Sequence, residues 1–559
     1  MIVVTMHIDD QTYTVNGRTY RRTLLRNSYR KDGKVCHDTI ATLSKCDNDE
    51  IEAIKFALAN KKNLAALRVP EKAVKTRQGL KVGAVWLLYQ LAKRLGIVKA
   101  MGRSVNAKLS LWMVISTIIG SVSRLSATRL AQSNAACDIL GLDSFCEDDL
   151  YTAMDWLHDH QQAIEKRLFK GRYEHEKPNM YLYDVTSSYF EGDQNELGDY
   201  GYNRDGKKGK KQIVIGLLTD DDGYPISSEV FRGNTRDTKT FKSQVDKAAR
   251  RFGIEEVTFV GDRGMIKSAQ VSDLTTEKYH YITALTKPEI ETLLKEDVVQ
   301  MELFDETVCE VESEGIRYIY RRNPVRASEI RDNRESKLRK IRDLCAQKTQ
   351  YLAEHPRGKV KVAKRIVKEK AGKLKIDKWV NISTQDRNLS VKIKEEVLEE
   401  EEKFDGCYVI KTDLSVETAS KQIVHDRYKS LAEVEWAFRT MKTTLLHIRG
   451  IFVRKANRTR AHVFSIMLAY LLAYELRRLW QDVEVTIEEG IDELCSLCAT
   501  EVIIGNVSVQ TVPEPRELGK LLLKRANVTL PDAIPCRHVN VFTRKKLVEE
   551  RRSSLKTHA

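Results

Sequence analysis

The spacing of hydrophobic residues changes along the chain, and each change predicts a different kind of structure. Near the N-terminus, short β-branched runs surround the pairs Asn16-Gly17 and Asp32-Gly33, which favour tight hairpin turns because both turn positions need positive φ. Between about residues 50 and 170, apolar residues recur every three or four positions, as amphipathic helices require. The chain is therefore predicted to begin with β-hairpins and to continue as a helical block.

Short strands replace the helical pattern after Met180. The runs predicted to be strands are 181–185, 212–218, 226–231, 257–260 and 281–285, followed later by 407–412. A helical pattern at 243–252 separates two of them, and alternation of strands with helices indicates an α/β sheet. The predicted fold class is therefore multidomain α/β, with β-rich and helical regions before the sheet and an insertion within it.

These changes of pattern divide the chain into six predicted parts. In chain order they are a β-hairpin region (1–48), a helical region (49–175), the first part of the sheet domain (176–289), an insertion (290–403), the second part of the sheet domain (404–480) and a C-terminal region (481–559). The helical region is expected to contact DNA, either through a helix-turn-helix or as a plain bundle. The C-terminal region is expected to be helical and to serve DNA binding or dimerisation.

The charge of the chain narrows the choice of partner. Lys and Arg number 94 against 79 Asp and Glu, a net charge of +15. Such a surplus favours nucleic acid, although a merely soluble basic protein has the same composition. Residues 326–378 hold 18 basic and 7 acidic residues, a net charge of +11. We expect Lys359, Lys361, Lys364 and Arg365 of this stretch to contact DNA phosphates, the alternative being a solvated charged face.

No apolar run is long enough to predict a membrane span. The strongest run, 109–122, falls short of the roughly 20 apolar residues that a spanning helix needs. Residues 461–476 are predicted to be a buried helix, where His462 is either a core residue or a neighbour of the site. Ten cysteines and an N-terminus without the basic segment of a signal peptide fit a reducing cytosol. We therefore expect a cytoplasmic protein without a membrane partner.

One group of cysteines has a weak metal-binding pattern. Cys495 and Cys498 are three positions apart, and Cys536 and His538 follow 38 residues later. Zinc sites use such residue types, but the first pair falls within a helix-like pattern. We expect buried thiols here rather than zinc ligands.

Three acidic residues stand in surroundings that favour a chemical role. Asp184 lies mid-strand in YLYDVTSSYF, where an ionised carboxylate is costly unless it is paired or binds a metal. Asp262 follows the strand of VTFVGDRGM, where α/β sheets place ligand groups. Glu435 shares a helical stripe with Arg439 and Lys442. Each acid alone also fits an ordinary structural role. Asp184 fits a hydrogen-bonded strand residue, Asp262 a turn residue, and Glu435 part of a surface salt-bridge ladder.

Taken together, these features resemble the insertion-sequence DDE transposases that carry the signature Y-x2-R-x3-E-x6-K. The four positions here are Tyr428, Leu431, Glu435 and Lys442. Leu431 stands where the family has Arg, and Arg427 or Arg439 are candidates to replace it. Other stretches resemble the same family in the same order, among them DVTSSYFEG, GYNRDGKKGKKQIVIGLL, VGDRGM and FDGCYVIKTDLS. The resemblance covers about residues 180–480.

The resemblance implies an RNase H-like core whose acids come from strand one, strand four and a late helix. Asp184, Asp262 and Glu435 would bind two Mg²⁺ or Mn²⁺ ions, with Asp184 bridging both. Tyr428, Arg439 and Lys442 would contact DNA.

The implied function is the cleavage of double-stranded DNA at the terminal inverted repeats of a transposon and the joining of those ends to target DNA. The protein would act as a homodimer on DNA, in the cytoplasm of a bacterium or archaeon and in association with the nucleoid. A related nuclease without strand transfer and a domesticated DNA-binding protein are the alternatives, and the complete acid triad argues against the second of these.

Overall fold

The computed structural model describes residues 5–543 apart from short gaps. The gaps are 17, 32–33, 60–73, 121–122, 264, 268–269, 272–273, 275–278, 443–444, 447, 449–450, 505–506 and 538. Gly17 and the pair Asp32-Gly33, where the sequence predicts turns, lie outside the described residues, and so does His538.

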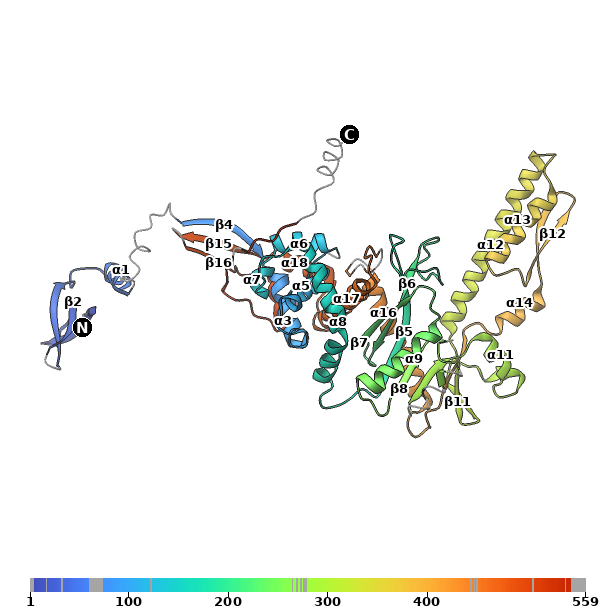
Figure 1. Cartoon of the computed structure of the whole chain (residues 1–559), viewed down its shortest axis with the longest axis horizontal. Coiled ribbons are helices and arrows are strands. Elements are labelled where there is room, and N and C mark those ends of the chain that lie inside the picture. Colours follow the sequence, from blue (N-terminus) through green and yellow to red (C-terminus); the bar gives the residue numbers. More distant parts are fainter. Residues whose placement is uncertain are drawn as a thin grey trace.

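A three-stranded antiparallel sheet forms the N-terminal part of the molecule. Its strands, in the order β1-β2-β3, are β1 (Thr5–Val15), β2 (Arg18–Lys31) and β3 (Lys34–Thr42), and helix α1 (Asn48–Ala59) follows them. Each strand pairs with the next one along the chain, as the hairpin signals predict. Leu24 of β2 and Ile51 of α1 are buried, and Figure 1 shows the sheet and α1 at one end of the molecule.

A block of helices surrounds one hydrophobic core. Its helices are α3 (Gly83–Arg94), α4 (Ile97–Met101), α5 (Val105–Ile119), α6 (Arg124–Ser133), α7 (Ala136–Leu140) and α8 (Glu147–Arg172). The long helix α17 (Ala456–Leu479) packs against α5 and α8 and against strand β7 (Pro225–Arg232), and its side chains are mostly buried. It therefore joins the helical block to the central sheet, as Figure 1 shows.

No single helix that the structure describes is both long enough and apolar enough to cross a membrane. Helices α5 and α6 meet both conditions only as a pair bent by 86°. Most side chains of α5 are buried within the helical block.

A second sheet corrects two of the predicted regions. Strand β4 (Val74–Lys81), from the region expected to be helical, pairs with β15 (Cys498–Ile504). Strands β16 (Val507–Thr511) and β17 (Ala533–Ile534) complete the sheet, and α18 (Ile487–Cys495) and α19 (Glu517–Arg525) flank them in the chain. The expectation of a helical C-terminal region was therefore wrong in part. Residues 498–511 are rich in β-branched side chains, and their partner strand lies about 420 positions earlier.

The central sheet has eight strands in the order β10-β11-β14-β9-β8-β5-β6-β7. In chain order, its strands other than β7 are β5 (Met180–Tyr189), β6 (Gln212–Thr219), β8 (Thr258–Gly261), β9 (His280–Ala284), β10 (Cys309–Ser313), β11 (Ile316–Arg322) and β14 (Cys407–Thr412). Strands β5, β8 and β9 are parallel, whereas the remaining pairs are antiparallel. All six strands predicted in this part of the sequence are confirmed.

The two faces of the central sheet are covered by different helices. Along β5, Leu182 points to a core shared with α17 and α16 (Leu431–Lys442), whereas Tyr181 and Tyr183 point to a second core. That second core contains Phe241 of α9 (Asp237–Asp246), which continues into the π-helical turn η3 (Lys247–Arg251). A strand buried on both faces needs apolar residues at successive positions, which explains the continuous hydrophobic runs in the sequence.

The predicted insertion at 290–403 differs from the observed one. Strands β10 and β11 fall within that range but extend the central sheet, after α11 (Lys287–Lys295) and the short turn η4 (Met301–Leu303). The separate part, which we call the basic lobe, consists of α12 (Pro324–Glu354), α13 (Val360–Lys373), β12 (Val380–Gln385), β13 (Asn388–Ile393) and α14 (Glu395–Glu402). It has its own core, which includes Ile341, Val367 and Trp379, and Figure 1 shows it extending away from the sheet.

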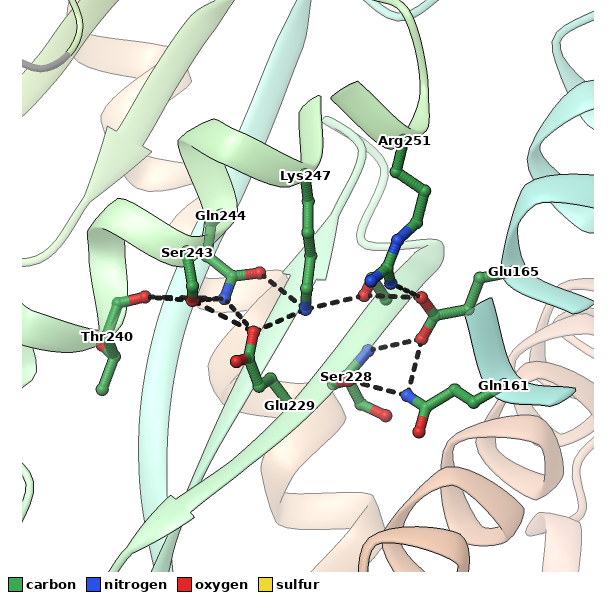
Figure 2. Close-up of polar contacts among 10 residues, drawn as sticks. Gln161, Glu165, Ser228, Glu229, Thr240, Ser243, Gln244, Lys247 and Arg251 are labelled. Atoms are coloured by element: carbon green, nitrogen blue, oxygen red, sulfur yellow. Dashed lines mark hydrogen bonds and ion pairs between the residues drawn. The ribbon is translucent and has the colours of Figure 1, made fainter. Parts of the chain in front are cut away.

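A buried network of charged side chains ties the helical block to the sheet (Figure 2). Glu165 of α8 is fully buried; it pairs with Arg251 of η3 and accepts hydrogen bonds from Ser227 Oγ at 3.0 Å and Gln161 Nε2 at 2.8 Å. On the other side of Ser227, Lys247 forms an ion pair of 2.8 Å with Glu229 of β7. Because each of the two carboxylates pairs with a cation of η3, the network fixes η3 against both α8 and β7.

Removal of the charge on Glu165 tests this network. We expect Glu165→Gln to lower the free energy of unfolding by about 3 kcal/mol, because Arg251 then lacks a carboxylate partner in a largely buried site. Thermal unfolding monitored by circular dichroism measures the change. Glu517→Gln is the matched control, since its ion pair with Lys520 lies on the surface and should leave the midpoint unchanged. Equal midpoints for both variants and the unmodified protein would contradict a stabilising role.

Candidate active site

Two of the predicted acids lie on neighbouring strands. Asp184 is in the middle of β5, and the parallel strand β8 pairs Leu182 with Val260 and Tyr183 with Gly261. Asp262 directly follows this paired segment and so lies beside Asp184, because neighbouring strands are about 4.8 Å apart. Asp184 is half-buried and Asp262 is exposed at the strand end.

The third acid reaches the same place from a helix. The apolar stripe of α16, which includes Val434, Phe438 and Met441, is buried, and the helix packs against β5. This packing leaves Glu435 on the exposed side of the helix, facing the two aspartates. Asp184, Asp262 and Glu435 all line both of two cavities, a larger one of about 520 Å³ and a smaller one of about 410 Å³.

The electrostatics of this site favour a cation. Burial is the main cause that raises the pKa of Asp184 to about 7, and the negative charges of Asp262 and Glu435 act in the same direction. The hydrogen bond from the Val185 N–H and the positive charge of Arg204 act against this rise. Three carboxylate side chains that line one cavity form a set of oxygen donors of the kind that Mg²⁺ or Mn²⁺ prefers. Among the described residues, however, no three such side chains already surround one point as ligands. The acids therefore share a cavity without forming a finished metal site.

The other residues of the signature have varied surroundings. Tyr428, near the end of α15 (Lys421–Lys429), donates a hydrogen bond from its hydroxyl to Asp262 Oδ1 at 3.4 Å, and burial raises its pKa. Leu431 lines the larger cavity at the start of α16. Arg439 is exposed and lines the smaller cavity, and Arg263 lines both. Of the two arginines predicted to replace the signature arginine, Arg439 therefore lines a cavity with the acids, whereas Arg427 lines neither of these two cavities in the described part of the chain.

Lys442 lines the smaller cavity together with the acids. Its Nζ pairs with Asp205 Oδ1 at 3.0 Å, and the two side chains are only 8% and 2% exposed. The pair fixes the loop that follows β5 onto the helix that carries Glu435.

This loop brings a residue into the site that sequence reasoning did not single out. Arg204 lines the smaller cavity, donates to both carboxylate oxygens of Asp237 at 2.7 and 2.8 Å, and donates its backbone N–H to Ser187 Oγ at 3.1 Å. Its signal in the sequence is the adjacent pair Arg204-Asp205 within a stretch that otherwise holds Gly, Asn, Tyr and Lys.

The larger cavity extends away from the acids toward the base of the basic lobe. Its apolar lining includes Leu285, Ile290, Ile330 and Phe404. Its basic lining consists of Lys287, Arg326 and Lys429, with Arg263 near the acids. The first turns of α12 therefore form one wall of the cavity that contains the acids.

The four basic residues predicted to contact DNA phosphates lie in the basic lobe. Lys359, Lys361 and Arg365 are exposed and Lys364 is half-buried, on α13 or at its N-cap in the basic lobe. They line neither cavity among the described residues.

His462 and the cysteines of the described residues belong to no group that could hold a metal ion. His462 is buried on α17, where burial and the nearby positive charge of Arg124 lower its pKa to about 3. Cys495 ends α18 and Cys498 begins β15, and the cysteines of the described chain belong to no candidate metal cluster.

Comparisons with known proteins match two parts of the chain to family models. The family described as "Transposase DDE domain" matches residues 175–472, and "IS1634 family transposase, N-terminal domain" matches residues 10–70. No curated protein sequence gives a match.

Two of the similar solved structures differ widely from this chain in sequence. One is a cryo-EM structure of the piggyBac transposase synaptic complex with hairpin DNA, at 9% identity and a TM-score of 0.37, covering 74% of this chain and 75% of that one. The other is Marinitoga piezophila Argonaute in complex with a 5′-OH guide RNA, at 9% identity and a TM-score of 0.15, covering 58% of this chain and 70% of that one.

The DDE domain match spans more than half of the chain and contains all three acids. Its N-terminal companion match belongs to transposases of an insertion-sequence family. The protein therefore belongs to the insertion-sequence DDE transposases and is a DNA transposase.

Proposed function

We propose that this transposase cleaves DNA at the ends of its element and joins them to target DNA by metal-ion chemistry at Asp184, Asp262 and Glu435. The observation that carries the proposal is that all three acids line one cavity, although they come from β5, the end of β8 and α16. In chain order, β5 and β8 are the first and fourth strands of the central sheet, and α16 is a late helix. This arrangement supports an RNase H-like core.

The donor set fits divalent cations, and Asp184, Asp262 and Glu435 are the residues that would hold them. A pair of bound Mg²⁺ or Mn²⁺ ions would supply an activated oxygen nucleophile and stabilise the leaving oxygen. Tyr428 holds the Asp262 carboxylate through its hydroxyl. Arg263 and Arg439 are placed to bind the phosphate on which the acids act, because guanidinium groups match phosphate geometry.

The parts outside the central sheet are proposed to bind DNA. The basic lobe supplies phosphate contacts through α13, and the helical region 49–175 and the C-terminal region bind the ends or a second subunit in a DNA-bound homodimer. A cytoplasmic, nucleoid-associated location accords with this function.

Loss of any one acid should abolish strand cleavage while leaving DNA binding intact. Asp184→Asn, Asp262→Asn and Glu435→Gln should each reduce cleavage by more than about 100-fold, because even residues behind metal ligands cost about 10- to 100-fold. The assay uses linear DNA with the element's inverted repeats and Mg²⁺. Calorimetric titration with Mn²⁺ provides a second readout, in which Asp184→Asn should lose binding.

The exposed Glu255, which lies before β8 and lines neither cavity, offers a matched control as Glu255→Gln. Nearly normal cleavage by any one acid variant would remove that residue from the proposed site. Nicked products without joined products would favour a nuclease that lacks strand transfer.

The buried pair Lys442–Asp205 should act through the loop rather than through DNA. Lys442→Met should lower the free energy of unfolding by about 3 kcal/mol, since Asp205 loses the cation beside it, and should reduce cleavage more than binding. The double variant Lys442→Met/Asp205→Asn should recover much of the stability and cleavage. Denaturant unfolding and the cleavage assay measure both effects. If the double variant recovered nothing, and the salt dependence of binding fell by about one phosphate contact, Lys442 would instead contact DNA.

The basic lobe should bind DNA without regard to sequence. Replacing Lys359, Lys361, Lys364 and Arg365 together with Gln should weaken binding to specific and random duplexes equally and lower the slope of log affinity against log salt by up to about four. A salt titration of binding measures this slope. Glu395→Gln and Glu396→Gln on exposed α14 form the control, because they remove charge of the other sign. An unchanged slope would mean that α13 is only a solvated face.

A further inference from the structure

Two loops at the C-terminal end of β5 expose aromatic side chains to an unusual degree. One loop precedes Gln212, which pairs with Tyr189, and the other follows Ile451, which bridges Phe190. Tyr202 is 80% exposed, Phe452 is 78% exposed and Tyr200 is 61% exposed, and Tyr202 and Phe452 are the most exposed large hydrophobic side chains in the part of the chain that the structure describes. Aromatic rings left in water to this extent require an explanation, because their burial against a partner is favourable.

The backbone that carries these rings is held firmly in place. Phe190 bridges Ile451, and the Glu191 N–H donates to the Ile451 carbonyl at 3.0 Å, which fixes the backbone next to Phe452. On the other side, Asp199 and Gln212 exchange backbone hydrogen bonds of 2.9 and 3.1 Å.

Two further contacts hold the backbone at the two tyrosines. Gln212 Nε2 donates to the Tyr202 carbonyl at 3.0 Å. At Gly201, between the tyrosines, a Cβ atom would lie 2.0 Å from the Gly233 carbonyl oxygen, so only glycine allows this close approach. The rings are therefore presented from a fixed scaffold.

One of the loops leads directly to the acids. The Arg204 guanidinium lies 5.4 Å from the centre of the Tyr202 ring and lines the smaller cavity together with Asp184, Asp262 and Glu435. The next residue, Asp205, is tied to the catalytic helix through Lys442. Tyr202 consequently lies beside the cavity in which a phosphodiester would be held.

Basic residues accompany the aromatic ones. Residues 199–211 hold five basic and two acidic residues, and Lys207 and Lys208 are exposed. Arg454 and Lys455, which follow Phe452, are exposed as well. Aromatic rings for stacking together with cations for phosphates are the combination by which proteins bind single-stranded nucleic acid.

We propose that Tyr200, Tyr202 and Phe452, with Lys207 and Lys208, form an aromatic–basic surface that binds unpaired nucleotides of the DNA strand whose phosphodiester lies at the acids. This inference rests on the proposed function and adds a substrate feature to it. The rings stack on base faces, which are covered in an intact duplex and become available only where the strands have separated. The lysines contact the backbone of the same nucleotides.

Binding to two DNA probes without divalent metal tests the proposal in the full-length protein. One probe is a fluorescent blunt duplex, and the other is the same duplex with a short thymidine overhang. Fluorescence anisotropy should show that Tyr202→Ala and Phe452→Ala each weaken binding to the overhang probe by about 10-fold or more, with little effect on the blunt duplex. Tyr202→Phe should restore binding, because the ring remains.

A control variant and two contrary results complete this test. Tyr13→Ala removes another exposed aromatic ring, one that stacks on Tyr20 in the N-terminal sheet, and should affect neither probe. Equal losses on both probes would mean that the rings insert into duplex DNA, and losses on neither would leave the surface for a protein partner; either result overturns the proposal. Since no cleavage is measured, these outcomes are independent of the acid-variant assay, which alone tests the proposed chemistry.

Discussion

The placement of the Asp184 carboxylate in the middle of a central strand is the constraint around which the active-site part of this molecule is arranged. A charge in the middle of a buried strand is unfavourable, and Asp184 meets two further acids there, which together with burial raises its pKa to about 7. The surrounding structure holds this arrangement through apolar contacts on both faces of β5 and through the buried stripe of α16. A cation bound at the proposed site would offset this unfavourable interaction, because it would neutralise the carboxylates.

Ion pairs hold the other segments of the site in place. Lys442 and Asp205 connect α16 to the loop after β5, Arg204 and Asp237 connect that loop to the start of α9, and Glu165 with Arg251 connects the following turn to the helical block. Each pair joins segments that the chain separates widely. Buried charges of this kind add little to stability relative to apolar packing, but each fixes one relative position of its partners.

The local pattern of the sequence was sufficient for the central strands, because burial on both faces leaves continuous apolar runs. The three acids, each of which alone fits an ordinary structural role, were singled out through the resemblance to a transposase signature. The local pattern was insufficient wherever the structure depends on pairing at a distance. The β4–β15 pairing and the Asp205–Lys442 ion pair join residues about 420 and 237 positions apart, and neither leaves a local signal. Strands β10 and β11 were assigned to an insertion for the same reason, since only their pairing with β14 shows that they belong to the sheet.

The β4–β15 pairing also bears on how the protein is made. Strand β4 precedes the helical block, whereas β15 to β17 and α19 leave the ribosome about 400 residues or more after it. Helix α17, which fills the core of the helical block, is likewise synthesised late. The N-terminal half of the protein therefore keeps apolar surface exposed until the C-terminal half has been synthesised. Such a dependence on distant segments slows folding and exposes nascent chains to chaperones. A chain that terminates before α16 lacks both the partner of β4 and the helix that carries Glu435, so the set of acids and the closed fold depend on the same late segments.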